Sequence, residues 1–200
     1  MRTRTLAIVL IGVVGVAAIG GVSSYNGLVG LDQKVRSQAA QVDNVYQRRA
    51  DLIPNLVATV KGAAGFEKDT LTAVTEARAK VGQVSGEGLA NIARDPAALQ
   101  RFQQAQDGLS SALSRLLVVS ERYPELKATQ AFRDLQVQLE GTENRVTVER
   151  MRFNEVAAEF NTRRNRFPTV LFAGLFGNKF AEKAYFQAQA GAQTAPKVQF

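Results

Sequence analysis

Two short groups of polar residues hold the side chains best able to do chemistry in this chain. Asp51 and Asn55 form the first group, and Glu143, Asn144 and Arg145 form the second. Carboxylate, amide and guanidinium groups gathered in one place can bind a small polar molecule or transfer a proton. On packed helices such side chains more often form a polar layer that sets the register. We favour the polar layer and keep a small-molecule or catalytic pocket as the alternative.

Pro54 lies inside the first group, within a hydrophobic pattern that is helical. A proline in a helix has no N–H to donate, and its ring crowds the carbonyl four residues earlier, so the Ala50 carbonyl loses its helical partner. We therefore expect Asn144 or Arg145 to donate a hydrogen bond to this carbonyl. We also expect Asp51 to form an ion pair with Arg145.

The composition excludes several classes of site. The 200 residues include no cysteine and no histidine, so the chain has no disulfide, no cysteine nucleophile, no imidazole base and few of the usual zinc or haem ligands. A di-iron bundle would need Glu-x-x-His pairs on facing helices. The sequence also has no P-loop, no dinucleotide-binding glycine motif and no G-x-S-x-G. We predict a non-enzymatic protein without metal or cofactor. The enzyme alternative would need an unrecognised Asp/Glu or Ser/Lys site.

The charge of the chain is basic but dispersed. The formal net charge is +7, and both signs occur along the sequence, which is typical of solvated helix faces. Arg163, Arg164 and Arg166 form a basic group without a recognisable nucleic-acid motif. This group suits lipid or solvent, and we predict no nucleic-acid partner.

The spacing of apolar residues predicts an all-α fold. Residues 25–166 contain four amphipathic helices, over 25–62, 67–83, 96–122 and 125–166, and no segment alternates as a strand does. The first helix has an approximately seven-residue repeat that Arg49 interrupts. A strict seven-residue period in the last helix predicts coiled-coil-like packing, and short connections predict an up-and-down four-helix bundle. This period comprises Phe132, Leu139, Val146, Phe153, Phe160 and Phe167.

Residues 1–24 are predicted to be a transmembrane anchor. From Leu6 to Val22 the chain contains only apolar residues and glycine, which is enough for a short bilayer span at ~1.5 Å per residue. A cleaved signal peptide is the alternative, but the run is long and is not followed by an A-x-A site. Arg2 and Arg4 precede the span, so the positive-inside rule predicts an external, periplasmic bundle.

Residues 167–200 form an apolar and aromatic C-terminal segment. In an up-and-down bundle the fourth helix returns to the membrane side, so the segment FPTVLFAGLFG at 167–177 is predicted to lie at the bilayer. The alternative is that it caps the open end of the bundle. The C-terminal segment ends in a tail from Ala188 to Lys197 that is rich in alanine, glutamine and glycine. The residues predicted at the membrane interface are Tyr25, Phe167, Phe172, Phe176 and Lys179.

Several strings, read together, resemble the LemA family of bacterial membrane-anchored proteins. The resemblance implies a four-helix bundle behind an N-terminal transmembrane helix in the bacterial inner membrane. It also implies an outside N-terminus, against the charge-based prediction, and it implies no established activity. The strings are YNGLV (25–29), RRADLIPNLVATVKG (48–62), ARA (77–79), YPELKA (123–128), LQVQLEGTENRV (135–146), FNEVAAEFN (153–161), FPTVLFAGLFG and APKVQF (195–200).

One residue departs from the family pattern. Glu149 occupies a core-type position that a small residue usually fills, and a buried charge there needs a partner. Taken together, the sequence predicts a membrane-anchored scaffold or adaptor. We expect it to contact membrane lipid and either copies of itself, as a homo-oligomer, or another membrane protein. An accessory subunit that regulates a membrane protease or transporter is the alternative.

Overall fold

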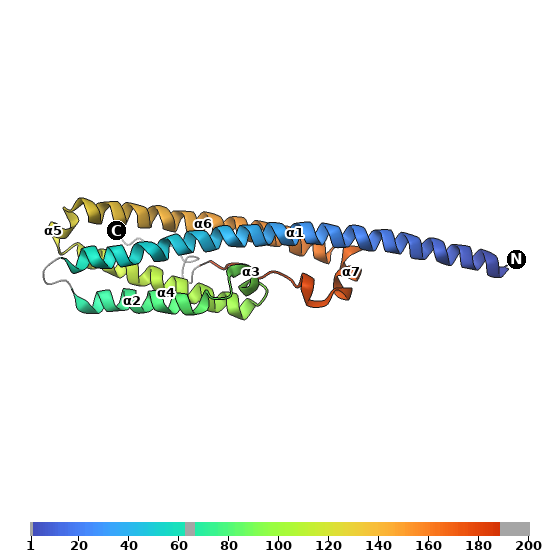
Figure 1. Cartoon of the computed structure of the whole chain (residues 1–200), viewed down its shortest axis with the longest axis horizontal. Helices are drawn as coiled ribbons and strands as arrows, with labels where there is room; N and C mark the ends of the chain where they lie inside the picture. The colour runs from blue at the N-terminus through green and yellow to red at the C-terminus, as the bar shows by residue number, and fades with distance from the viewer. Residues whose placement is uncertain (1, 63–66, 189–200) are drawn as a thin grey trace, which may run out of the picture.

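The computed structural model describes residues 2–62 and 67–188 of the chain. These residues form helices, turns and one extended segment, without a strand. The predicted all-α fold is confirmed, with a long apolar N-terminal helix that continues into a helical bundle (Figure 1). The alanine- and glutamine-rich tail predicted from Ala188 onward lies almost wholly outside the described residues, as does the APKVQF string.

Helix α1 (Arg2–Lys61) is a single helix of 60 residues. The sequence predicts an anchor over 1–24 and a separate helix over 25–62, but the structure joins the two without a break. In the described part of the chain, α1 is the one helix long and apolar enough to cross a membrane. Its most apolar window has a mean hydropathy of 2.5, and none of that window is buried inside the protein.

Three further long helices complete the bundle. Helix α4 has the clearest start signal, because Pro96 occupies its first turn and the Asp95 carboxylate accepts a hydrogen bond of 2.9 Å from the Ala97 amide. The long helices are α2 (Lys68–Val84), α4 (Pro96–Ser120) and α6 (Gln130–Asn165), and the short elements are α3 (Leu89–Ile92), α5 (Pro124–Lys127), α7 (Thr169–Leu175) and the 3₁₀ turn η1 (Gly177–Phe180).

Two details of the last predicted helix are wrong. The region 125–166 is divided into α5 and α6, because Thr129 caps α6 by accepting a hydrogen bond of 3.4 Å from the Phe132 amide. The predicted core repeat also ends at Phe160, one member before Phe167. Helix α6 stops at Asn165, Pro168 follows, and the Phe167 side chain is 75% exposed.

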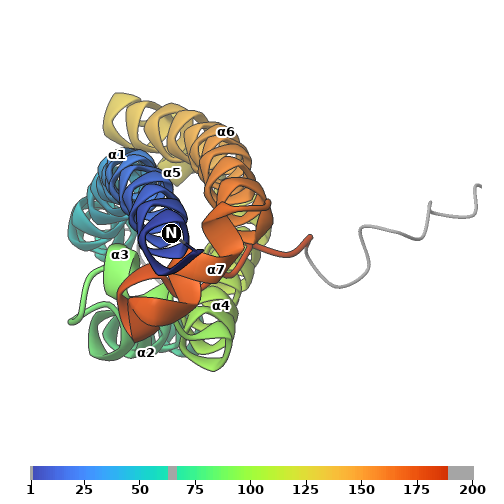
Figure 2. The same ribbon diagram turned by 90° about the vertical axis from the view of Figure 1, so that its right-hand side faces the viewer.

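The helices run up and down. Helices α1 and α6 pack against each other over a long stretch, and α2 and α4 form a second packed pair (Figure 1). We call the end at α5 the distal end, and the end where α1 leaves the bundle the proximal end. Viewed from the proximal end, α7 lies beside α1, and it also contacts α6 (Figure 2).

The core consists of two apolar clusters. The distal cluster draws on all four long helices and includes Leu56, Val74, Leu116 and Phe132. In the proximal cluster α2 contributes no fully buried residue. The C-terminal residues Ala173, Phe180 and Phe186 pack there instead, against residues of α1 and α6 such as Leu28, Val35, Phe153 and Phe160. The C-terminal segment therefore closes the proximal half of the core.

Candidate functional site

The polar contacts predicted around Pro54 do not form. The Ala50 carbonyl accepts a hydrogen bond of 3.2 Å from Arg78 Nε on α2, and not from Asn144 or Arg145. Asp51 accepts a hydrogen bond of 2.7 Å from Gln47 on its own helix, and forms no ion pair with another described residue.

The register of the helices explains this correction. Ile53, Leu56 and Val60 turn inward in the distal cluster, which leaves Asp51, Pro54 and Asn55 exposed on the outer side of α1. Asn144 and Arg145 are likewise exposed on α6, beside the buried Val146. Of the polar residues predicted in this layer, Glu143 alone reaches across to another described helix. Whether the exposed ones contact a partner protein stays a prediction.

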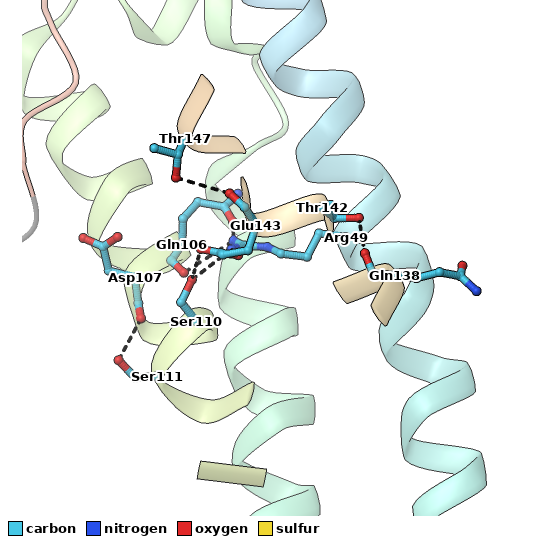
Figure 3. A network of polar contacts seen from close by, with 9 residues as sticks. All are labelled: Arg49, Gln106, Asp107, Ser110, Ser111, Gln138, Thr142, Glu143 and Thr147. Carbon is cyan, nitrogen blue, oxygen red and sulfur yellow. Dashed lines mark hydrogen bonds and ion pairs between the residues drawn. The ribbon is translucent and has the colours of Figure 1, made fainter. Parts of the chain in front are cut away.

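A polar layer exists nevertheless, and it is built around Arg49. Arg49 Nη1 donates hydrogen bonds of 2.7 Å to Glu143 Oε2 and 2.9 Å to Ser110 Oγ. Arg49 Nη2 donates to the side-chain oxygen of Gln106, and Ser110 Oγ donates to Glu143 Oε1 at 3.1 Å. The layer thus joins α1, α4 and α6, and Figure 3 shows the four side chains converging between these helices.

The two charges of this ion pair differ in burial. The Arg49 side chain is 2% exposed, whereas the Glu143 side chain is 43% exposed. The Arg49 guanidinium also lies 5.2 Å from the ring centre of Tyr46, which in turn packs edge-on against Phe102. Arg49 Nε and Gln106 Nε2 are buried without a hydrogen-bond partner. The sequence signal for this layer is the arginine that interrupts the apolar repeat of α1.

A hollow of about 460 Å³ lies beside the layer, between α1, α2 and α4. It is lined by two titratable groups whose pKa values are shifted, which is the arrangement that the enzyme alternative requires. Burial raises the pKa of Asp43, although its Oδ2 accepts a hydrogen bond of 3.0 Å from the Leu89 amide at the start of α3. Burial raises the pKa of Tyr46 to about 12. Burial accounts for both raised pKa values, and the Asp43 carboxylate is already engaged as the cap of α3. A phenol that stays protonated at neutral pH is a poor catalytic base.

A second charged cluster holds the C-terminal segment at the proximal end. Lys183 Nζ lies 2.6 Å from Asp32 Oδ1, and Arg36 Nε lies 2.8 Å from Asp32 Oδ2. Burial raises the pKa of Asp32, but the hydrogen bonds from Lys183 and Arg36 outweigh it, so the pKa lies below its ordinary value of 3.8. Arg94, on the turn after α3, approaches the same carboxylate at 3.9 Å. This cluster ties residues 181–188 to α1.

The residues after Lys183 continue along α6. Asn161 donates a hydrogen bond of 2.9 Å to the Lys183 carbonyl, and Asn154 pairs in both directions with the backbone of Phe186. Gln103 of α4 does the same with Gln187. Asn154 and Asn161 lie two turns apart on one face of α6. Together with Gln103 they form hydrogen bonds with the backbone of the extended segment, which is not paired with a strand in the described part of the chain.

Four of the five residues predicted at the membrane interface lie close together. The Tyr25 ring packs edge-on against Phe176 at 5.0 Å between ring centres, and Lys179 Nζ lies 4.7 Å from the Tyr25 ring centre and donates to its hydroxyl. The Phe172 ring packs against α1 at Gly21, where a side chain would meet it at 3.2 Å. Phe167 projects outward instead. The segment therefore packs on the bundle, and contact of these residues with lipid stays a prediction.

The charge at Glu149 has the partners that its position requires. Gln38 of α1 donates a hydrogen bond of 2.7 Å to Glu149 Oε2, and Arg152 lies 2.8 Å from Oε1. The side chain is 12% exposed. A carboxylate is tolerated at this core-type position because it lies at the edge between α1 and α6 and is hydrogen-bonded on both oxygens.

Comparison of the sequence with known proteins finds several relatives. Magnetosome protein MamQ 2 of Paramagnetospirillum magneticum is 24% identical over 85% of this chain and 67% of its own length. Magnetosome protein MamQ of Magnetospirillum gryphiswaldense is similar to the same extent. Protein LemA of Metamycoplasma hominis is 22% identical over 71% of this chain and 60% of its own length. None of these names denotes an enzyme.

A family model also matches most of the chain. It covers residues 38–200, which include the C-terminal part of α1, the whole Arg49 layer and the C-terminal segment, and the model is that of the LemA family. The resemblance that the sequence strings predict is thereby confirmed, and the chain belongs to the LemA family.

Proposed function

We propose that this protein is a membrane-anchored, non-enzymatic scaffold that presents a stiff helical bundle to other proteins. The single observation that carries the proposal is the continuity of α1. One helix of 60 residues includes both the exposed apolar segment and core residues of the proximal and distal clusters. A continuous helix fixes the direction and height of the bundle relative to the anchor, which a flexible linker would not do.

The chemistry of the bundle also favours a structural role. Its most buried charge, on Arg49, is hydrogen-bonded to three other helix-borne residues and takes no part in an open site. Among the described residues, no group of histidine, cysteine and carboxylate side chains could hold a metal ion. We therefore propose that the molecule acts by binding: it contacts lipid at the proximal end and protein partners along the exposed helix faces.

The proposed location is a bacterial inner membrane with a single span. Arg2 and Arg4 precede the apolar segment of α1, so the positive-inside rule favours a cytoplasmic N-terminus and a periplasmic bundle. An accessory subunit of a membrane protease or transporter would have the same placement. The two functions differ in whether one enzyme or several structural proteins bind.

Cross-linking of the full-length protein in its native membrane, followed by mass spectrometry and native sizing in detergent, tests the proposal. A scaffold should give defined assemblies whose cross-links map to exposed faces of α2, α4 and α6. A variant with a flexible Gly-Ser insertion after Val22 is the matched control, since it keeps the anchor but loses the fixed bundle height. The scaffold would be contradicted if the unaltered protein and the insertion variant were both monomers without cross-linked neighbours.

A further inference from the structure

The outer face of α6 carries a second apolar stripe, opposite the one that packs into the core. Val137, Val148 and Met151 are 68%, 39% and 56% exposed, and Gly141 and Asn144 are exposed between them. Steps of four and three residues alternate along this row. That alternation is the spacing of a coiled-coil seam. Solvated helix faces are normally polar, so an apolar stripe of this spacing is a candidate contact surface.

The membrane anchor restricts which partner this stripe can fit. Two copies anchored by α1 in one bilayer have the same orientation, so a two-fold axis between them is perpendicular to the membrane. Their α6 helices then run parallel, with each residue at the same height as its equivalent. A parallel pair brings Asn144 against Asn144 of the second copy, where the two side-chain amides can hydrogen-bond to each other. Gly141 allows the two helices to approach closely.

The charges beside the stripe are complementary in this arrangement. Glu140 and Arg145 flank the seam on opposite sides, five residues apart, which is the spacing at which side chains of two parallel helices pair across a seam. Within the described part of the chain neither residue forms an ion pair, and Glu140 accepts only a hydrogen bond of 3.0 Å from Gln136. In a symmetric pair the Glu140–Arg145 contact forms twice.

We infer that the outer face of α6, from Val137 to Met151, is a parallel coiled-coil interface with a second copy of this chain. The stripe covers about two heptads, which is short for a coiled coil in solution, but confinement to one membrane raises the effective concentration of the partner. The inference rests on the proposed anchored scaffold for the common orientation of the two copies. It also gives Asn144 and Arg145 a role outside their own bundle.

Because the chain has no cysteine, single-cysteine variants of the full-length protein in lipid vesicles test the interface directly. Val137→Cys is compared with Val118→Cys on α4, since these valines are 68% and 70% exposed. A short thiol cross-linker should give a dimer several-fold more efficiently at position 137. Equal yields of dimer at the two positions would overturn the inference.

The charge pair provides a second readout in the Val137→Cys background. Glu140→Arg or Arg145→Glu alone should lower the dimer fraction about fivefold, because two symmetric ion pairs become repulsive. The double variant should restore it, and no restoration would count against the parallel register. If Val137→Cys gives no dimer in the native membrane while cross-links to other proteins are retained there, the interface would be overturned and the scaffold would still stand.

Discussion

Taken as a whole residue, Arg49 is the most deeply buried charged residue in the described part of the chain, at 1% exposure. Its ion pair is asymmetric, because Glu143 is 43% exposed at the edge of the layer. A carboxylate that loses its partner there can still be hydrated, whereas the guanidinium cannot. A charge left unpaired in the core is strongly destabilising, while replacement of the charged group by an apolar one of similar size costs less.

This asymmetry predicts which half of the pair matters more for stability. Glu143→Gln should lower the free energy of unfolding of the full-length protein by about 3 kcal/mol, because it leaves the Arg49 charge buried without a carboxylate. Arg49→Met should cost less, since hydration of Glu143 compensates. Chemical denaturation in detergent measures both values, and Glu159→Gln in the exposed pair with Lys34 is the control. A greater loss for Arg49→Met would contradict this account.

At the scale of the elements, two segments depart from regular bundle structure, and side chains compensate in both. Pro54 stays within α1 because the exposed carbonyl of Ala50 finds Arg78 on α2. The extended residues 181–188 take the place of a helix in the proximal half. The ion cluster at Asp32 and the amide side chains of Asn154 and Asn161 attach them there.

Attachment of this C-terminal segment should depend on pH. The pKa of Asp32 lies below its ordinary value of 3.8 in the folded chain, so its ion pairs contribute stability above that value. The contribution is lost as the pH falls through the lower, folded pKa. Protonation then leaves the Lys183 ammonium buried without its carboxylate, and residues 181–188 should detach before the distal half unfolds.

Hydrogen exchange of residues 181–188 between pH 6 and pH 3, corrected for the intrinsic pH dependence of exchange, measures this detachment. The Asp32→Asn variant should exchange rapidly in this segment even at pH 6. Glu182→Gln removes a carboxylate that is 57% exposed in its pair with Arg164, and it should behave as the unaltered chain does. Full protection of the segment in Asp32→Asn would contradict the role of the cluster.

At the scale of the whole molecule, the proximal end is apolar. The free part of α1 leaves the bundle beside α7. Leu171 and Leu175 of α7 and Phe167, two residues before it, point outward and are 60%, 79% and 75% exposed. These residues repeat every four positions on one side of the segment, while Ala173 on the other side is buried in the proximal cluster. An apolar stripe of this kind beside a membrane span is typical of a helix that lies in the bilayer interface.

We expect the proximal end to rest on the lipid. The chain contains no tryptophan, so Leu175→Trp places a unique fluorophore on the stripe in vesicles of the full-length protein. Brominated lipids should quench its emission strongly, because the ring would lie at the depth of the acyl chains. Val118→Trp, on the distal part of α4, should be unaffected. Equal quenching at the two positions, or none at Leu175→Trp, would show that the bundle is not seated in this way.

Local patterns in the sequence were sufficient to predict the helical fold and the apolar segment. The start of α4 follows from Asp95 and Pro96, and the burial of Phe132, Phe153 and Phe160 follows from their seven-residue period, because both depend on neighbours a few residues away. The LemA resemblance rested on strings distributed in order along the chain, and the family match confirms it.

Contacts between distant parts of the chain required the tertiary structure. The sequence placed Asp51 opposite Arg145. In the structure, however, Arg49 lies on the inward face of α1 and pairs with Glu143. The attachment of Lys183 to Asp32 joins residues 151 positions apart, and no local spacing encodes it. Periodicity determines which residues share one face of a helix. Which faces meet, and at what height, is decided by how all the side chains of the core pack together.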